Sequence, residues 1–175
     1  MTSEFNKAFD HLMAMEGGYS NTPGDRGGET KFGISKRAFP DVDLPNLTRD
    51  GAKSIYWKCY WTHSKLNCQA LIFPGFGTPG LAERVFWFAV HSGVGTAASA
   101  FQRAYNRARP RTRKELKVDG WIGPVSLRAF DSLSQFDREI LDVTFHVEQV
   151  NYYYGVVKRD PVQDKFLRGW LRRLV

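Results

Sequence analysis

Apolar residues recur at helical spacing along most of this chain, and this pattern constrains the fold more than any other feature of the sequence. Between residues 3 and 15, for example, Phe5, Ala8, Phe9 and Leu12 fall on one face of a helix. The same spacing predicts further helices over residues 48–60, 81–92, 97–108, 124–133, 134–158 and 161–174. We therefore expect a chain that is mostly α-helical.

Polar residues that favour helix starts precede several of these segments. Ser3, Thr48 and Ser134 can each accept a hydrogen bond from the first turn of the helix that follows. Asp137 completes a capping box with Ser134. Asp160-Pro161 favours the start of the last helix, and one side of that helix would consist of Phe166, Leu167, Trp170, Leu171 and Leu174.

One stretch near the N-terminus departs from the helical pattern. Residues 17–28 are rich in Gly, Ser, Asn, Asp and Pro, which favour turns, and residues 30–35 are typical of a short strand. A small hairpin or irregular sheet is therefore expected there. The predicted fold class is α+β, mostly α, with a small N-terminal β-hairpin and a helical C-terminal lobe.

The composition predicts a folded globular protein and excludes a membrane span. Of the 175 residues, 42% are apolar and 14% aromatic, far more than disordered chains contain. The longest uninterrupted apolar run is only residues 85–90, too short to cross a bilayer. Glu4, Lys7 and Asp10 interrupt any signal-peptide core. We expect a protein that is made without its own signal peptide and stays in the cytoplasm unless released.

The two cysteines, Cys59 and Cys68, form no C-x-x-C pair and have no histidine cluster near them in the sequence. This spacing argues against a disulfide scaffold and against a zinc site. We expect both thiols to be reduced and buried, and we expect neither a metal nor a cofactor.

The charge is distributed unevenly along the chain. Residues 1–50 carry a net charge of −2, whereas the other residues carry +9, giving the total of +7. Such a cationic body favours a polyanionic partner, either nucleic acid, a phosphorylated membrane face or an acidic cell-wall polymer. Because the sequence contains no recognisable nucleic-acid-binding motif, we expect no nucleic-acid partner.

Three polar residues near the N-terminus could take part in acid-catalysed chemistry. Glu16 falls at the end of the first apolar helix, where partial burial would raise its pKa toward the range of a general acid. Asp25 lies in the turn-rich stretch, where it would remain ionised, and Thr30 could hold a water or a sugar hydroxyl. Two carboxylates in contrasting environments suit glycosidic bond hydrolysis. A surface glutamate beside a tight turn is an equally good interpretation of Glu16 from these residues alone.

Several motifs, in the same order as in a known family, favour the catalytic interpretation. They are E-G-G-Y-S-N at 16–21, D-x-G-G-x-T at 25–30, G-I-S at 33–35, V-F-x-x-A-V-H-S-G at 85–93, V-D-G-x-I-G-P at 118–124 and F-L-x-G-W-L-x-R at 166–173. The chain resembles glycoside hydrolase family 108, whose members include bacterial and phage lysozymes acting as N-acetylmuramidases. Its later motifs resemble the peptidoglycan-binding lobe that follows in this family.

The resemblance implies a lysozyme-like fold and hydrolysis of the β-1,4 bond between N-acetylmuramic acid and N-acetylglucosamine. By the same resemblance, Glu16 matches the catalytic glutamate, and Asp25 and Thr30 complete the catalytic arrangement. The implied organisation is a catalytic region over residues 1–80 and a peptidoglycan-binding lobe over residues 81–175, packed as one unit.

Further residues are expected to contact the substrate. Tyr19 lies beside the acid in sequence, where its ring could contact a sugar face, and Asn21 follows it. The chain has Trp87 and His91 where the family often has Asp and Asn. We expect His91 to contact the substrate, although an isolated histidine on an apolar helix is often a structural residue.

Other functions remain compatible with the sequence. A lytic transglycosylase acts on the same substrate with one acid, and a non-catalytic wall-binding module would need no acid at position 16. A phage endolysin, released to the wall through another protein's membrane lesion, fits the absence of a signal sequence, as does a secreted bacterial toxin.

We expect a monomer whose partner is peptidoglycan. The last helix, with Lys165, Arg168 and Trp170, either docks on the domain or binds an anionic outer-membrane surface.

Overall fold

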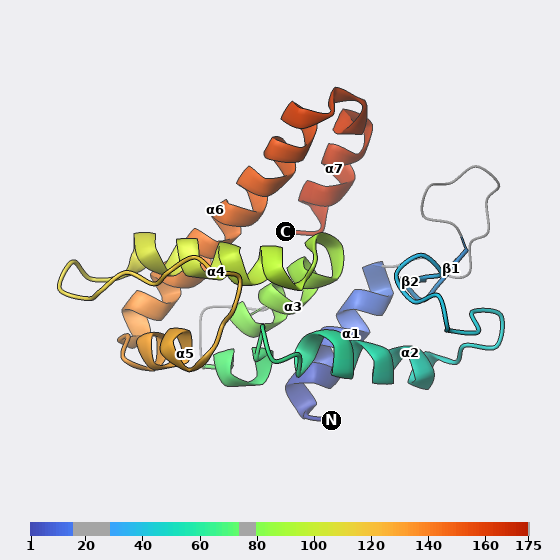
Figure 1. Cartoon of the computed structure of the whole chain (residues 1–175), viewed down its shortest axis with the longest axis horizontal. Coiled ribbons are helices and arrows are strands. Elements are labelled where there is room, and N and C mark those ends of the chain that lie inside the picture. Colours follow the sequence, from blue (N-terminus) through green and yellow to red (C-terminus); the bar gives the residue numbers. More distant parts are fainter. Residues whose placement is uncertain (16–28, 74–79, 175) are drawn as a thin grey trace.

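The computed structural model describes residues 1–15, 29–73 and 80–174. Within these ranges the chain forms seven α-helices, three short helices of other pitch and one two-stranded antiparallel sheet (Figure 1). The predicted class, α+β and mostly α, is confirmed. Among the described residues, no helix is long and apolar enough to cross a membrane.

Helix α1 (Ser3–Met15) buries Phe5, Ala8, Phe9 and Leu12, the face predicted from the spacing. The prediction that Ser3 caps this helix is wrong, because Ser3 is already its first residue. The hydroxyl of Thr2 instead accepts a hydrogen bond from the amide of Phe5 at 3.4 Å.

The expected hairpin occupies only six residues. Strand β1 (Thr30–Lys31) pairs antiparallel with β2 (Ile34–Ser35), and Thr30 lies opposite Ser35. The two turn residues, Phe32 and Gly33, have φ values of 52° and 75°. Positive φ at both central residues is what a type I′ turn requires. Residues 30–35 therefore contain the whole hairpin rather than a single strand.

Helix α2 (Arg49–Tyr56) begins at the predicted cap, where the Thr48 side chain accepts a hydrogen bond from Gly51 N. It continues as a π-helical turn, η1 (Trp57–Trp61), in which Thr62 N donates to Trp57 O at 2.9 Å. The wider turn brings Trp61 into the core with Tyr56, whereas α-helical spacing would bury Cys59. Cys59 is only half-buried, so the expectation of a buried thiol is wrong for Cys59 and correct for Cys68.

The core centres on α3 (Leu81–Ser92), which packs against α1, α4 and α6. A short 3₁₀ turn, η2 (Cys68–Leu71), also packs on it. The buried side chains of α3 are Leu81, Ala82, Val85, Phe86, Phe88 and Ala89. Because these residues face several neighbours, α3 joins the N-terminal and C-terminal parts of the molecule in one core.

The remaining helices form the C-terminal part of the fold. Helix α4 (Val94–Ala108) packs along α6 (Gln135–Arg159), and α5 (Pro124–Asp131) precedes α6. The predicted cap of α6 is confirmed, because the Ser134 hydroxyl accepts from Asp137 N at 3.1 Å. Helix α5 and the β1–β2 hairpin lie at opposite ends of the long axis of the molecule (Figure 1).

The C-terminal helix begins later than predicted. The Asp160 carboxylate accepts from Val162 N, and this cap starts a 3₁₀ turn, η3 (Pro161–Gln163). Helix α7 (Asp164–Arg172) follows and folds back beside α6 (Figure 1). Leu167, Trp170, Leu171 and Leu174 pack against the core as predicted, whereas Phe166 is 48% exposed and its ring lies 6.0 Å from that of Trp170.

Candidate active site

Of the six predicted site residues, Thr30 and His91 lie within the described part of the chain. Glu16, Tyr19, Asn21 and Asp25 lie outside the described residues, so their roles stay predictions. The residues that precede and follow them in the sequence are described, and they show how the chain is held before residue 16 and after residue 28.

Helix α1 is held on the core by apolar packing and by one hydrogen bond from α3. Met15 is the last residue of α1 and directly precedes Glu16. The indole Nε1 of Trp87 donates to Ala8 O at 3.0 Å, which joins α3 to the middle of α1. Because Phe9 and Leu12 are also fully buried, the backbone that leads into residue 16 is anchored on the core.

His91 lies on α3 beside this end of α1 and contacts protein groups through both ring nitrogens. Its Nδ1 is 2.9 Å from Trp87 O, and its Nε2 is 2.9 Å from Arg173 Nη1. Met15, Trp87, His91 and Arg173 line the same small cavity. His91 is therefore adjacent to the residue that precedes Glu16, and its contact with substrate stays a prediction.

Thr30 lies on β1 and is partly exposed. Tyr56 connects its hairpin to α1, because the Tyr56 hydroxyl donates to Phe32 O at 3.1 Å and its ring lies 5.9 Å from that of Phe9. One buried tyrosine thus fixes the hairpin relative to the helix that leads to Glu16.

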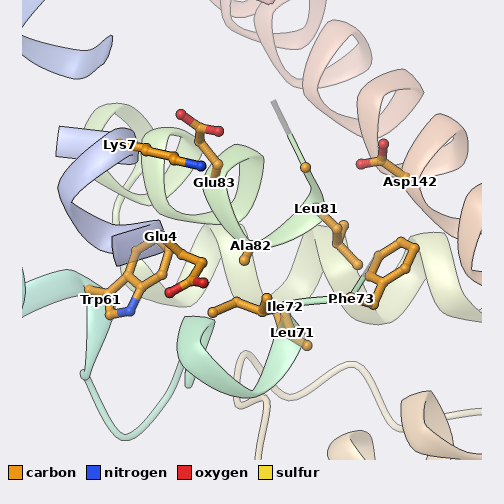
Figure 2. A pocket seen from close by; sticks show the side chains of 11 residues that line it. Glu4, Lys7, Trp61, Leu71, Ile72, Phe73, Leu81, Ala82, Glu83 and Asp142 are labelled. Atoms are coloured by element: carbon orange, nitrogen blue, oxygen red, sulfur yellow. The ribbon is translucent and has the colours of Figure 1, made fainter. Parts of the chain in front are cut away.

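A second cavity lies at the opposite end of α3 (Figure 2). Its volume is about 200 Å³. Glu83 from α3 and Lys7 from α1 lie on one side of it and Asp142 from α6 on the other, with Leu71, Ile72 and Leu81 between them. Residues 83 and 91 are separated by about 12 Å along a helix of ordinary rise, so this cavity is distinct from the one at His91.

Two carboxylates that line this second cavity, Glu83 and Asp142, each have a basic partner. His11 Nδ1 lies 2.7 Å from Glu83 Oε1, and Arg84 Nε lies 3.3 Å from Asp142 Oδ1. Burial raises the pKa of Glu83 and of Asp142, while these neighbouring bases act against the rise. A pocket whose carboxylates have raised pKa values has features of an active site. Glu83 is therefore the carboxylate with which the proposed role of Glu16 has to be compared.

Within residues 1–15, 29–73 and 80–174, no three His, Cys, Asp or Glu side chains gather as metal ligands would. Sequence reasoning missed Arg173 as a neighbour of the site. It is 82 residues from His91, and no local pattern connects the two.

Comparison with known proteins finds two matching families and several similar solved structures. Residues 9–93 match the family described as glycosyl hydrolase 108, and residues 96–175 match the family described as predicted peptidoglycan domain. The solved structure of Brucella abortus SagA is similar with a TM-score of 0.73 and 25% sequence identity. The match covers 97% of this chain and 88% of that chain. No curated protein matches the sequence significantly.

These matches confirm the lysozyme-like fold and the family resemblance of the sequence motifs. The two family matches meet between residues 93 and 96, where α3 gives way to α4. The chain therefore carries a glycosyl hydrolase 108 domain over residues 9–93 and a peptidoglycan domain over residues 96–175, and it is a glycoside hydrolase that acts on peptidoglycan.

Proposed function

We propose that the protein is a lysozyme that cleaves the β-1,4 bond between N-acetylmuramic acid and N-acetylglucosamine. The main support is that a rigidly packed α1 ends at Met15, directly before the carboxylic acid Glu16, within the part of the chain that matches the hydrolase family. Retaining and inverting glycosidases both need one acid that protonates the leaving oxygen.

In this proposal each polar residue has a separate role. Glu16 donates a proton to the glycosidic oxygen as the bond breaks. Asp25, as a carboxylate, orients the attacking water or stabilises the positive charge that develops on the sugar. The Thr30 hydroxyl holds that water, and Tyr19, Asn21 and His91 contact the sugar chain.

Product analysis on purified peptidoglycan tests the bond. We expect mass spectrometry to find fragments that carry N-acetylmuramic acid at a reducing end. Reducing N-acetylglucosamine ends would contradict the proposed bond. Anhydro-sugar ends, lighter by one water, would identify a lytic transglycosylase and would remove the water-directing role of Asp25.

We also propose that the protein acts as a phage endolysin, reaching the wall from the cytoplasm through another protein's membrane lesion. Support comes from the matches to a glycosyl hydrolase and to a peptidoglycan domain, which together suit an enzyme that degrades the cell wall. Expression of the full chain in bacteria should leave the culture intact until a pore-forming protein is co-expressed. Lysis without such a protein would contradict this route.

A further inference from the structure

A groove at the far end of the molecule from the β1–β2 hairpin is formed by α5 and the loop before it (Figure 1). Its volume is about 270 Å³, and its walls include Lys117, Asp119, Trp121 and Val125. The side chains of Trp121 and Val125 are 49% and 65% exposed. A tryptophan with half of its side chain exposed is uncommon on the surface of a folded protein. The neighbouring exposed valine extends this apolar area.

The loop that carries Trp121 is held rigidly by one buried side chain. The Gln102 amide donates to Asp119 Oδ1 at 2.7 Å and to Trp121 O at 3.0 Å. Its oxygen accepts from the backbone amides of Asp119 and Gly120, each at 3.0 Å. Gly120 has a φ of +74°, and a Cβ there would lie 3.2 Å from Gly95 O, so this position requires glycine.

The same loop sets the orientation of the indole ring. Trp121 Nε1 donates to Ser64 O at 2.8 Å, which fixes one edge of the ring. A Cβ on Gly123 would lie only 2.8 Å from Cε2 of that ring. One face of the indole ring therefore packs on the backbone of Gly123. The exposed area of the ring lies on its opposite face and along its edge.

A purely structural role explains only part of this arrangement. The loop is also joined to residues 64–67 by Ile122 N donating to Lys65 O at 2.8 Å and by Asn67 Nδ2 donating to Ile122 O at 2.7 Å. Ile122 is fully buried and anchors the loop on the core. These contacts hold the loop in place and do not require an exposed indole face. They therefore do not explain why the groove is apolar.

We propose that this groove binds the glycan strand of peptidoglycan, with a sugar ring stacked on the outer face of Trp121. A sugar presents an apolar C–H face that suits an aromatic ring, and hydroxyl and acetamido groups that suit the exposed Asp119 and Lys117 at the rim. The match of residues 96–175 to a peptidoglycan domain favours this occupant. The inference rests on the proposed function for its substrate class.

The electrostatics of the rim support the same ligand. The hydrogen bond from Gln102 lowers the pKa of Asp119, so its carboxylate is an acceptor at neutral pH. Because α5 and the hairpin are at opposite ends of the molecule, the groove would hold the wall at a position separate from the bond that is cleaved (Figure 1).

Binding to intact, insoluble cell-wall sacculi in the cold tests the proposal, with Glu16→Gln as the background so that the wall is not digested. We expect Trp121→Ala to weaken co-sedimentation by about tenfold or more. Trp121→Phe keeps a ring and loses the bond to Ser64, so it should retain most binding. Val125→Gln, which leaves the loop contacts intact, should weaken binding several-fold.

The matched control is Val143→Gln on α6, because Val143 is 67% exposed and lies outside the groove. It should bind the wall as the parent does. Val125→Gln binding as tightly as Val143→Gln would overturn the proposal, as would Trp121→Phe losing as much binding as Trp121→Ala. Gel filtration that shows a dimer in the parent and a monomer in Val125→Gln would also overturn it, because the groove would then be a self-interface.

A second measurement separates this proposal from the catalytic one. With Glu16 present, Trp121→Ala should raise the KM for sacculi more than it lowers kcat, whereas Val143→Gln should keep both at the parental values. If Glu16→Gln proved fully active, the assignment of Glu16 as the catalytic acid would fail. The comparison of wall binding among the variants at positions 121 and 125 would still test whether the groove binds peptidoglycan.

Discussion

His91 on α3 and Arg173 at the end of α7 are joined by a contact of 2.9 Å between Nε2 and Nη1. The other ring nitrogen, Nδ1, lies 2.9 Å from the carbonyl oxygen of Trp87. A carbonyl only accepts, so Nδ1 carries the proton and Nε2 accepts from the guanidinium. The C-terminal helix is thereby tied to the cavity at the end of α1.

This contact predicts energetic coupling between residues far apart in the sequence. Single His91→Ala and Arg173→Ala variants should each lower the free energy of unfolding, and the double variant should lower it by less than their sum. The expected coupling is about 0.5–1.5 kcal/mol, measured by urea denaturation. Arg172→Ala, at an exposed neighbouring position, should be additive with His91→Ala.

Replacing the proposed acid should abolish catalysis without unfolding the protein. Glu16→Gln keeps the shape of the side chain but cannot deliver a proton, so turnover of purified peptidoglycan should fall at least ~100-fold. The measurement is a turbidity assay, with circular dichroism to verify folding. A folded variant with near-parental activity would remove Glu16 from the mechanism.

The control is Glu83→Gln, the same chemical change in the cavity of Figure 2. Glu83 lies 2.7 Å from His11 and its pKa is raised by burial, so it is a competing candidate for an acid among the described residues. We expect Glu83→Gln to retain the parental rate. A loss as large as that of Glu16→Gln would move the catalytic centre to this cavity.

Asp25 and Thr30 should affect the chemical step more than binding. Asp25→Asn removes the charge that directs water or stabilises the transition state, so kcat should fall far more than wall affinity. Thr30→Ala should produce a weaker form of the same defect. Rates on soluble fragments and sedimentation with sacculi measure the two effects separately. Equal losses in both would identify these residues as substrate holders.

Local signals in the sequence predicted much of the fold. The caps at Ser134 and Thr48 involve residues within one helical turn, and both lie at the start of the observed helices. The π-turn after Tyr56 escaped prediction because the choice between burying Cys59 and Trp61 depends on partners such as Phe5 and Phe86. Those partners come from other helices, and spacing within one segment does not specify them.

The candidate site could be predicted only where its residues are close in sequence. The apolar helix that leads to Glu16 was predicted from residues 3–15, and α1 covers these residues, whereas the place of Glu16 itself stays a prediction. The pairing of His91 with Arg173, and the hydrogen bond from Trp87 to Ala8, depend on how α3, α7 and α1 pack together. The division of the chain at residues 80 and 81 stays a prediction.

Docking of α7 predicts that Trp170→Ala destabilises the protein. The Trp170 ring stacks on Tyr153 of α6 with centroids 5.3 Å apart, and the side chain is partly buried. A fully buried tryptophan would cost ~3–5 kcal/mol, so a partly buried one should cost about 2 kcal/mol. Thermal melting measures the loss. Phe166→Ala, on the exposed side of α7, should cost less.

The competing role of α7 is binding to an anionic outer-membrane surface through Lys165, Arg168 and Arg172. In that case Trp170→Ala would melt like the parent but would kill intact Gram-negative cells less well, while still digesting purified wall. That combination of results would contradict docking as the main role of Trp170.

Stability should depend on the protonation of His146. Burial, together with the charge of Arg84, lowers the pKa of His146 below its ordinary value of 6.5. The unfolded chain therefore binds this proton at a higher pH than the native protein does. The stability that neutral His146 contributes is complete above about pH 6.5 and is lost as the pH falls toward the lowered pKa. Arg84 Nη1 lies 3.2 Å from His146 Nδ1, so protonation would also oppose two positive charges.

Melting temperatures measured between about pH 7 and pH 5 test this effect. His146→Asn keeps an acceptor for Arg84 and cannot titrate, so its melting temperature should fall less on acidification than that of the parent. Asp142, which also contacts Arg84, acts in the opposite direction. Because burial raises the pKa of Asp142, the native state binds this proton more readily than the unfolded chain does, and Asp142→Asn should steepen the loss. Parallel pH profiles for the parent and His146→Asn would show that His146 does not contribute to the pH dependence.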